Sequence, residues 1–195
     1  DFLAALQAGD FDGAVDAVLH QGACSDTMAG DGRYVMDNNY RYSMALLDFC
    51  IDEEVPLIYA STAAVYGASS AFREERSCES PLNVYGYSKH LFDQAVAERF
   101  VKKEKLPPQW AGLKFFNVFG PNEYHKGEMT SVVFKALHQI RETGKVRLFK
   151  SYKPEYGDGG QMRDFVYVKD CVEVLWWFLN HGEVNGIFNL GTGKA

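Results

Sequence analysis

A tyrosine and a lysine stand four positions apart in the stretch YGYSK, as Tyr85 and Lys89. If this stretch is helical, the two side chains are neighbours, because residues i and i+4 lie on the same helix face. A lysine cation favours the tyrosinate and lowers the pKa of the phenol, which could then exchange protons with an alcohol near neutral pH. Of the 11 tyrosines, only Tyr85 has a lysine at this distance, although a single such pair can also arise by chance.

Two hydroxyl side chains precede this pair, in the stretch STAAVYG at residues 61–67, directly after an apolar run. Ser61 and Thr62 would stand at the end of a strand, and Thr62 could hold a substrate oxygen opposite the phenol of Tyr85. The alternative is a plain turn rich in small residues. A strand-end Ser or Thr followed by Y-x-x-x-K is more specific than either motif alone.

The elements that would position these residues alternate along the first 120 residues. Apolar runs predict buried strands over 14–23, 55–61 and 110–121, and the intervening segments predict helices over 31–54 and 81–104. Strands joined by helical crossovers indicate an α/β fold with a doubly wound, Rossmann-like parallel sheet. Ligands of such sheets bind beyond the carboxyl ends of the strands, which are residues 20–25, 60–67 and 116–121 here.

The remainder of the chain is less regular. We expect a helix over 129–144 that ends at Gly144, a short strand over 146–152, and a polar, Gly-rich loop over 153–164. A strand and an amphipathic helix follow over 165–182, where Trp176, Trp177 and Phe178 are expected in the core.

Composition excludes several classes of protein. The net charge of −6 and the lack of clustered Lys and Arg argue against a nucleic-acid surface, and the apolar runs are shorter than the ~20 residues of a membrane span. The four cysteines form no C-x-x-C pair and His125 has no spaced partner, so we expect no metal site and reduced thiols in a cytoplasmic protein. The ending GTGKA is no P-loop, because Phe188 replaces the first glycine and Ala195 the final Ser or Thr.

The chain begins without a methionine, in a stretch that reads as the middle of a helix, and contains neither G-x-G-x-x-G nor G-x-x-G-x-x-G. We therefore expect a fragment of a longer protein, with the Gly-rich turn that holds a dinucleotide pyrophosphate lying upstream.

Four stretches resemble the extended short-chain dehydrogenase/reductase superfamily of nucleotide-sugar epimerases and dehydratases: YASTAAVYG, PLNVYGYSK, FFNVFGP and RDFVYVKD. Within it, GACSDT, YVMDNNY and above all NVFGPNEYHKGEMTSVVF resemble the ADP-heptose 6-epimerases, whereas UDP-galactose 4-epimerases lack H-K-G-x-M. The resemblance implies inversion of C6 of ADP-D-glycero-D-manno-heptose by transient oxidation with tightly bound NADP, which supplies heptose for the lipopolysaccharide inner core. It also implies that the protein is a homo-oligomer and that it binds a small nucleotide sugar as its substrate.

The resemblance also assigns roles to residues. Thr62, Tyr85 and Lys89 match the catalytic residues, with Lys89 also on the nicotinamide ribose, and Lys126 matches a second acid/base. The implied cofactor contacts are Gln21, Gly22, Ala23, Cys24, Ser25, Asn38, Tyr85, Lys89, Val118 and Lys126. The implied substrate contacts are Thr62, Asn117, Phe149, Lys150, Ser151, Tyr152 and Arg163. Residues 1–120 would form part of an NADP-binding domain, and residues 121–195 a substrate-binding region that completes the sheet.

The sequence departs from the family pattern at Glu128, where Ser is frequent, at Lys135, where His is found, and in a longer loop at 153–162. Three alternatives stay open: a nucleotide-sugar 4-epimerase, a 4,6-dehydratase, and an inactive truncated domain. Ala63 and Ala64 stand where a dehydratase has an Asp-Glu pair, which argues against that reaction. NAD is an alternative to NADP, because the choice depends on charges after a strand that precedes this chain.

Overall fold

The computed structural model describes residues 2–152, 154 and 157–194. The chain forms two compact units, one of Asp1–Phe115 with Glu173–Asn189 and one of Phe116–Val172 with Leu190–Ala195. The chain leaves the first unit after Phe115, and residues 173–189 return to it.

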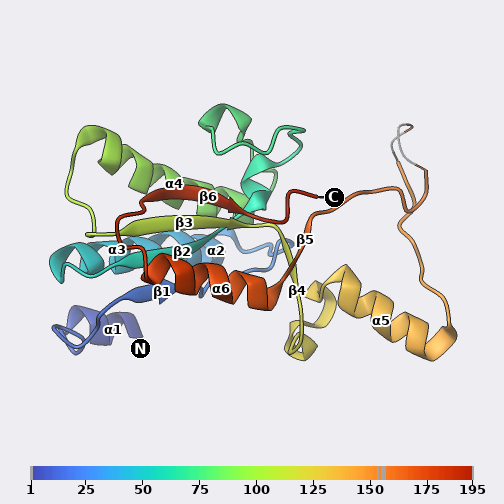
Figure 1. Ribbon diagram of the computed structural model, residues 1–195, viewed down its shortest axis with the longest axis horizontal. Helices are drawn as coiled ribbons and strands as arrows, with labels where there is room; N and C mark the ends of the chain where they lie inside the picture. Colours follow the sequence, from blue (N-terminus) through green and yellow to red (C-terminus); the bar gives the residue numbers. More distant parts are fainter. Residues whose placement is uncertain (1, 153, 155–156, 195) are drawn as a thin grey trace. The chain divides into compact units, whose positions relative to one another are not determined.

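The first unit is built on a sheet with the strand order β1-β2-β3-β6 (Figure 1). The strands are β1 (Val18–His20), β2 (Leu57–Thr62), β3 (Trp110–Phe115) and β6 (Gly186–Leu190). Both β1 and β3 pair with β2 in parallel, with Ile58 opposite Leu19 and Ala111. The expected parallel sheet is therefore confirmed, although β1 is shorter than the apolar run that predicted it. Leu57, Ile58 and Tyr59 are buried because β2 has neighbours on both edges.

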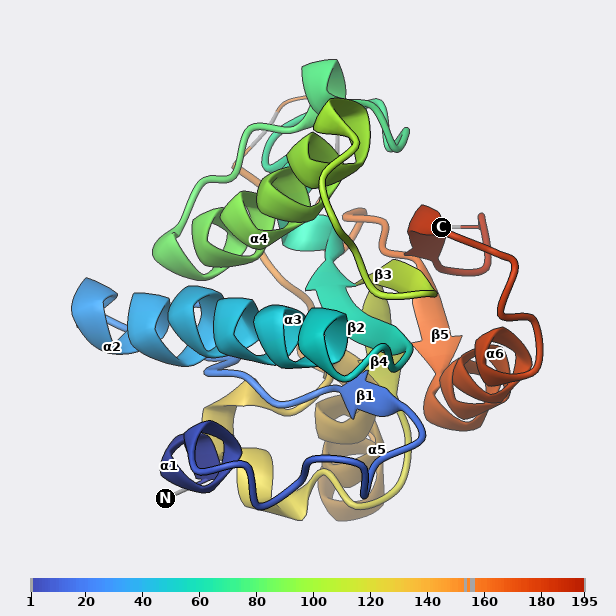
Figure 2. The same ribbon diagram turned by 90° about the vertical axis from the view of Figure 1, so that its left-hand side faces the viewer.

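Helices cover both faces of this sheet. The first unit contains α1 (Phe2–Gln7), α2 (Gly32–Met36), the π-helical turn η1 (Asp37–Arg41), α3 (Tyr42–Asp52), the 3-10 turns η2 (Ala63–Tyr66) and η3 (Arg76–Cys78), and α4 (Val84–Lys102). Figure 2 shows α3 and α4 on one side of β1 to β3, and the part of α6 (Val168–Leu179) that belongs to this unit on the other. The helix predicted over 31–54 is thus interrupted by a π turn that apolar spacing does not signal.

The core of the first unit joins α3, α4 and the sheet. Leu47, Phe92, Val96 and Tyr59 are buried in one cluster, and the Tyr59 and Phe92 rings meet edge to face at 4.7 Å. Of the three aromatic residues expected in the core from α6, Phe178 is buried, but Trp176 and Trp177 are 67% and 46% exposed. Three consecutive residues cannot all face the sheet, because successive helical positions turn about the axis.

The second unit contains β4 (Asn117–Phe119), the 3-10 segment η4 (Tyr124–Met129), α5 (Val132–Thr143) and β5 (Phe165–Tyr167), with β4 and β5 parallel. The strand predicted over 110–121 is therefore two strands in different sheets, divided at Phe116. Helix α5 ends at Gly144 as predicted, with φ 69° at this residue.

The strand predicted over 146–152 is wrong, since the structure has no regular element there and leaves Leu148 68% exposed. The segment alternates apolar and polar residues, but a strand is stable only when it pairs with a neighbouring strand, and none pairs with this segment among the described residues. The loop predicted next, over 153–164, includes residues 153, 155 and 156, which lie outside the described residues.

Among the described helices, none is long and apolar enough to cross a membrane.

Candidate active site

Tyr85 and Lys89 lie in the first turns of α4, as the Y-x-x-x-K spacing predicts. The helix begins at Asn83, whose side chain accepts a 2.7 Å hydrogen bond from the Gly86 amide. Lys89 is only 3% exposed, and its Nζ donates a 2.8 Å hydrogen bond to the carbonyl of Ala60 in β2. Burial lowers the pKa of Lys89 to about 8, while the Asp93 carboxylate opposes this shift.

The phenol of Tyr85 lies close to the Thr62 hydroxyl at the end of β2. Burial raises the pKa of Tyr85, and the hydrogen bond with the Thr62 side chain lowers it by less. The expected lowering of this pKa by Lys89 is therefore wrong for the free site, because loss of solvent outweighs the hydrogen bond with Thr62. The structure does bring together Thr62, Tyr85 and Lys89, all at the carboxyl end of β2.

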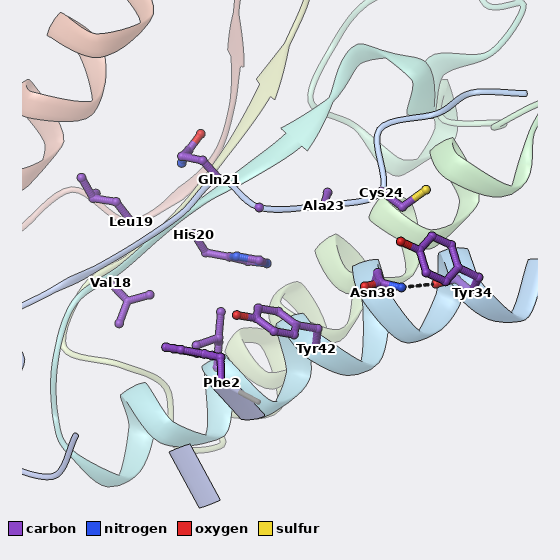
Figure 3. Close-up of a pocket in the computed structure, with 12 residues that line it drawn as sticks. Phe2, Val18, Leu19, His20, Gln21, Ala23, Cys24, Tyr34, Asn38 and Tyr42 are labelled. Carbon is purple, nitrogen blue, oxygen red and sulfur yellow. Dashed lines mark hydrogen bonds between the residues drawn. The ribbon is translucent and has the colours of Figure 1, made fainter. Parts of the chain in front are cut away.

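The predicted cofactor loop borders a pocket of about 440 Å³ at the end of β1. Figure 3 shows Gln21, Ala23 and Cys24 on the loop facing Tyr34 and Asn38 of the α2–η1 segment. Four of the five predicted loop residues line this pocket, with Ser25 as the exception. Exposed backbone groups beside an aromatic ring suit part of a dinucleotide, whereas a Gly-rich turn for the pyrophosphate is absent from the 195-residue sequence.

Asn39 organises this loop and was not singled out in the sequence. Its Oδ1 accepts from the Cys24 amide at 2.8 Å, and its Nδ2 donates to the Cys24 carbonyl at 3.0 Å and to Ser88 Oγ at 2.9 Å. Ser88 in turn donates to the Tyr85 carbonyl at 2.7 Å. Asn39 therefore ties the loop to the helix that carries Tyr85. The sequence signal for it was the Asn-Asn doublet at residues 38 and 39, in which the resemblance assigned the cofactor contact to Asn38.

Buried charged groups lie beneath the site. The Ser61 hydroxyl donates to Asp93 Oδ2 at 2.6 Å, one helical turn after Lys89. Lys114 of β3 forms an ion pair with Glu79, which also lies 3.0 Å from His90 Nδ1. Ion pairs of this kind are expected where charged groups leave water.

Lys126, the predicted second acid/base, lies in η4 of the second unit. Its side chain is 42% exposed, and its Nζ is 4.0 Å from Glu123 Oε2. Glu123 is held in place by the amide and the hydroxyl of Ser131, at 2.6 and 2.8 Å. Although burial acts to raise it, the pKa of Glu123 is lowered overall, mainly by these hydrogen bonds.

The other predicted substrate residues of the second unit do not form one cluster in the described contacts. Asn117 Nδ2 donates to the Asp164 carbonyl at 3.1 Å, next to Arg163, and Val118 follows in β4. The contacts of residues 149–152 run instead to their own loop, for example from the Ser151 amide to Asp158 Oδ1 at 2.8 Å. The Lys150 carbonyl accepts a hydrogen bond from Gln161 Nε2 within the same loop, while the side chains of Phe149 and Tyr152 are exposed.

Two of the three departures from the family pattern, Glu128 and Lys135, contact each other. Lys135 Nζ donates to the Glu128 carbonyl at 2.6 Å and lies 3.2 Å from its carboxylate. The substitutions thus form one exposed ion pair within the second unit.

Comparison with known proteins gives concordant matches. The family model described as "NAD dependent epimerase/dehydratase family" matches residues 6–191. A protein of Thiobacillus denitrificans named ADP-L-glycero-D-manno-heptose-6-epimerase is 55% identical over all 195 residues, which cover 58% of its length. The chain spans less than two thirds of the relatives it matches.

Solved structures agree in fold. The Helicobacter pylori ADP-L-glycero-D-manno-heptose-6-epimerase matches with a TM-score of 0.82 at 30% identity, over 100% of this chain and 58% of that one. A UDP-N-acetylglucosamine 4-epimerase from Methanobrevibacter ruminantium M1 matches with a TM-score of 0.77 at 25% identity, over 97% of this chain and 60% of that one.

Proposed function

The chain belongs to the NAD dependent epimerase/dehydratase family, and from this premise we propose that the complete protein inverts C6 of ADP-D-glycero-D-manno-heptose. The substrate assignment rests on the 55% identity to the T. denitrificans ADP-L-glycero-D-manno-heptose-6-epimerase, which extends over the whole chain. It includes both the helix of Tyr85 and the HKGEM segment. The product would supply heptose for the lipopolysaccharide inner core.

The reaction class follows from the groups at the end of β2. The Thr62 hydroxyl would hold the oxygen on C6, and Tyr85 would take the hydroxyl proton and later return a proton. Because burial raises its pKa, Tyr85 is protonated in the free site. The phenol must therefore lose its own proton before it can accept the proton of the C6 hydroxyl, and the Lys89 cation would stabilise the resulting phenolate. When bound, the nicotinamide dinucleotide supplies the reversible acceptance of hydride that oxidation at C6 requires.

Inversion motivates the second acid/base. A sugar that is oxidised on one face and reduced on the other presents its oxygen in two orientations, which one fixed phenol does not serve equally. We assign the second role to Lys126.

For the cofactor we propose NADP, with NAD as the alternative within the family. Residues 21–25 and Asn38 would contact the adenosine side, and Tyr85, Lys89, Val118 and Lys126 the nicotinamide side. Asn117, Arg163 and residues 149–152 would contact the substrate. We further propose that the protein is a cytoplasmic homo-oligomer.

Proton NMR of the complete gene product with ADP-D-glycero-D-manno-heptose tests this function. We expect the L-glycero product to appear without net consumption of cofactor. Tyr85→Phe should lower the rate by about 100- to 10,000-fold, whereas Tyr87→Phe, on an exposed side chain of the same helix, should leave it unchanged. Lys126→Met should also abolish inversion, and full activity of this variant would contradict the two-base mechanism. Conversion of UDP-galactose in place of the heptose would identify a 4-epimerase.

A further inference from the structure

Asp93 is a buried acid one helical turn beyond Lys89 and has no role in the proposed reaction so far. Its side chain is 3% exposed, and its Oδ2 accepts the 2.6 Å hydrogen bond from Ser61. The buried phenol of Tyr59 interacts with the same carboxyl group. Asp93 therefore contacts β2 through Ser61.

Lys89 and Asp93 hold adjacent residues of β2. Lys89 Nζ donates to the carbonyl of Ala60 at 2.8 Å, and Asp93 binds the side chain of the next residue, Ser61. Thr62, which meets the phenol of Tyr85, follows immediately. The two charged side chains of α4 thus fix the strand end that presents Thr62.

Three other titratable groups, Lys114, Glu79 and His20, interact with this pair. Lys114 of β3 attracts the Asp93 carboxylate and Glu79 repels it. His20 of β1 faces Lys89, but burial keeps its pKa at about 4, so the imidazole is neutral at pH 7. Lys114 and Glu79 form an ion pair with each other. Asp93 is then the carboxylate that favours the charged form of the buried Lys89.

We infer that Asp93 is a positioning residue, whose carboxylate keeps the Lys89 ammonium charged and, through Ser61, fixes the strand end beneath Thr62 and Tyr85. An isolated buried ammonium tends to lose its proton, because a low-dielectric interior disfavours the charge. Burial raises the pKa of Asp93 to about 6 and lowers that of Lys89 to about 8. Between these values both groups are charged, which is the range in which Lys89 can stabilise a Tyr85 phenolate.

The test is Asp93→Asn, because the amide oxygen can still accept from Ser61 while the charge is lost. The inference rests on the proposed function for its catalytic meaning, so the first readout needs no turnover. The titration of Lys89 is followed by NMR of 13C-labelled lysine in the complete gene product. We expect its midpoint to fall by about one pH unit or more. The control Asp48→Asn, an exposed acid paired with Arg99 of α4, should leave the midpoint in place.

The second readout is the pH profile of turnover. Loss of the Lys89 cation should move the alkaline limb of kcat to lower pH by the same amount, with KM for the nucleotide sugar unchanged because Asp93 is buried and paired with Ser61. An unshifted Lys89 midpoint in a folded Asp93→Asn protein overturns the inference. A shifted midpoint in the variant, together with a wild-type protein that converts no nucleotide sugar, overturns the proposed function instead and leaves Asp93 with its effect on the Lys89 charge alone.

Ser61→Ala covers the case in which Asp93→Asn fails to fold. The Ser61 hydroxyl lowers the pKa of Asp93, so its removal raises the pKa of Asp93 towards the range in which Lys89 titrates. The Lys89 midpoint should then shift in the same direction by a smaller amount. A midpoint that stays at its original pH contradicts the inference in this variant as well.

Discussion

Asn39→Ala is predicted to destabilise the protein and to release the cofactor loop. Asn39 is fully buried and makes three hydrogen bonds, two to the Cys24 backbone and one to Ser88. These bonds connect residues 21–25 to α4, so one substitution removes the link between the loop and the helix of Tyr85.

The magnitude follows from these contacts. A typical hydrogen bond contributes about 1 kcal/mol net, and a partner left buried and unsatisfied costs more. Three bonds therefore give a loss of about 3 kcal/mol in the free energy of unfolding. Cys24 is partly exposed, so water can satisfy its backbone groups and hold the loss near this value.

The neighbouring asparagine supplies the control. Among the described residues, the Asn38 side chain makes one hydrogen bond, from Nδ2 to the Tyr34 carbonyl at 2.8 Å, within its own helical turn. Asn38→Ala should change the free energy of unfolding by less than about 0.5 kcal/mol. Both variants should weaken NADP binding, through a lost contact for Asn38 and a disordered loop for Asn39.

Urea unfolding of the cofactor-free protein, together with fluorescence titration of NADP, separates these effects. A loss below about 1 kcal/mol for Asn39→Ala, or equal losses for both variants, would refute the assignment of the loop clamp to Asn39.

Two further predictions concern stability. Burial holds the pKa of His20 at about 4 against 6.5, so the unfolded state binds the extra proton and stability falls as pH drops from 6.5 to 4. Asp93 acts in the opposite sense, because its pKa of about 6 against 3.8 adds stability as pH drops from 6 to 3.8. Asp93→Asn should therefore steepen the acid loss by about 2 kcal/mol in urea unfolding at pH 4 relative to pH 6.5, and parallel curves for variant and wild type would contradict this. Gly112→Ala would place a Cβ 2.5 Å from the Tyr59 ring and should cost about 1–3 kcal/mol, whereas Gly182→Ala, with open space around it, should be near neutral; equal Tm values for the two would refute the clash.

The sequence by itself determined the local elements and the reaction group of the first unit. Apolar runs and the intervening helical segments predicted β2, β3 and α4, because these local patterns depend on neighbouring residues. The i, i+4 spacing placed Tyr85 and Lys89 on one helix, and the strand-end rule placed Thr62 beside them. The resemblance carried by HKGEM and YGYSK also agrees with the family that the chain belongs to.

Tertiary structure decided the features that depend on distant residues. The pKa of Tyr85 rises because the packed unit removes water from the phenol, which the local Tyr-Lys spacing cannot report. Asn39, rather than Asn38, holds the loop because the π turn aims it at Cys24 and Ser88, residues 15 and 49 positions away. The segment 146–152 has strand-like residues but no partner strand, so it stays irregular. Burial and pairing are properties of the assembled sheet and helices, and for that reason Asp93 beneath Lys89 became visible only in the folded chain.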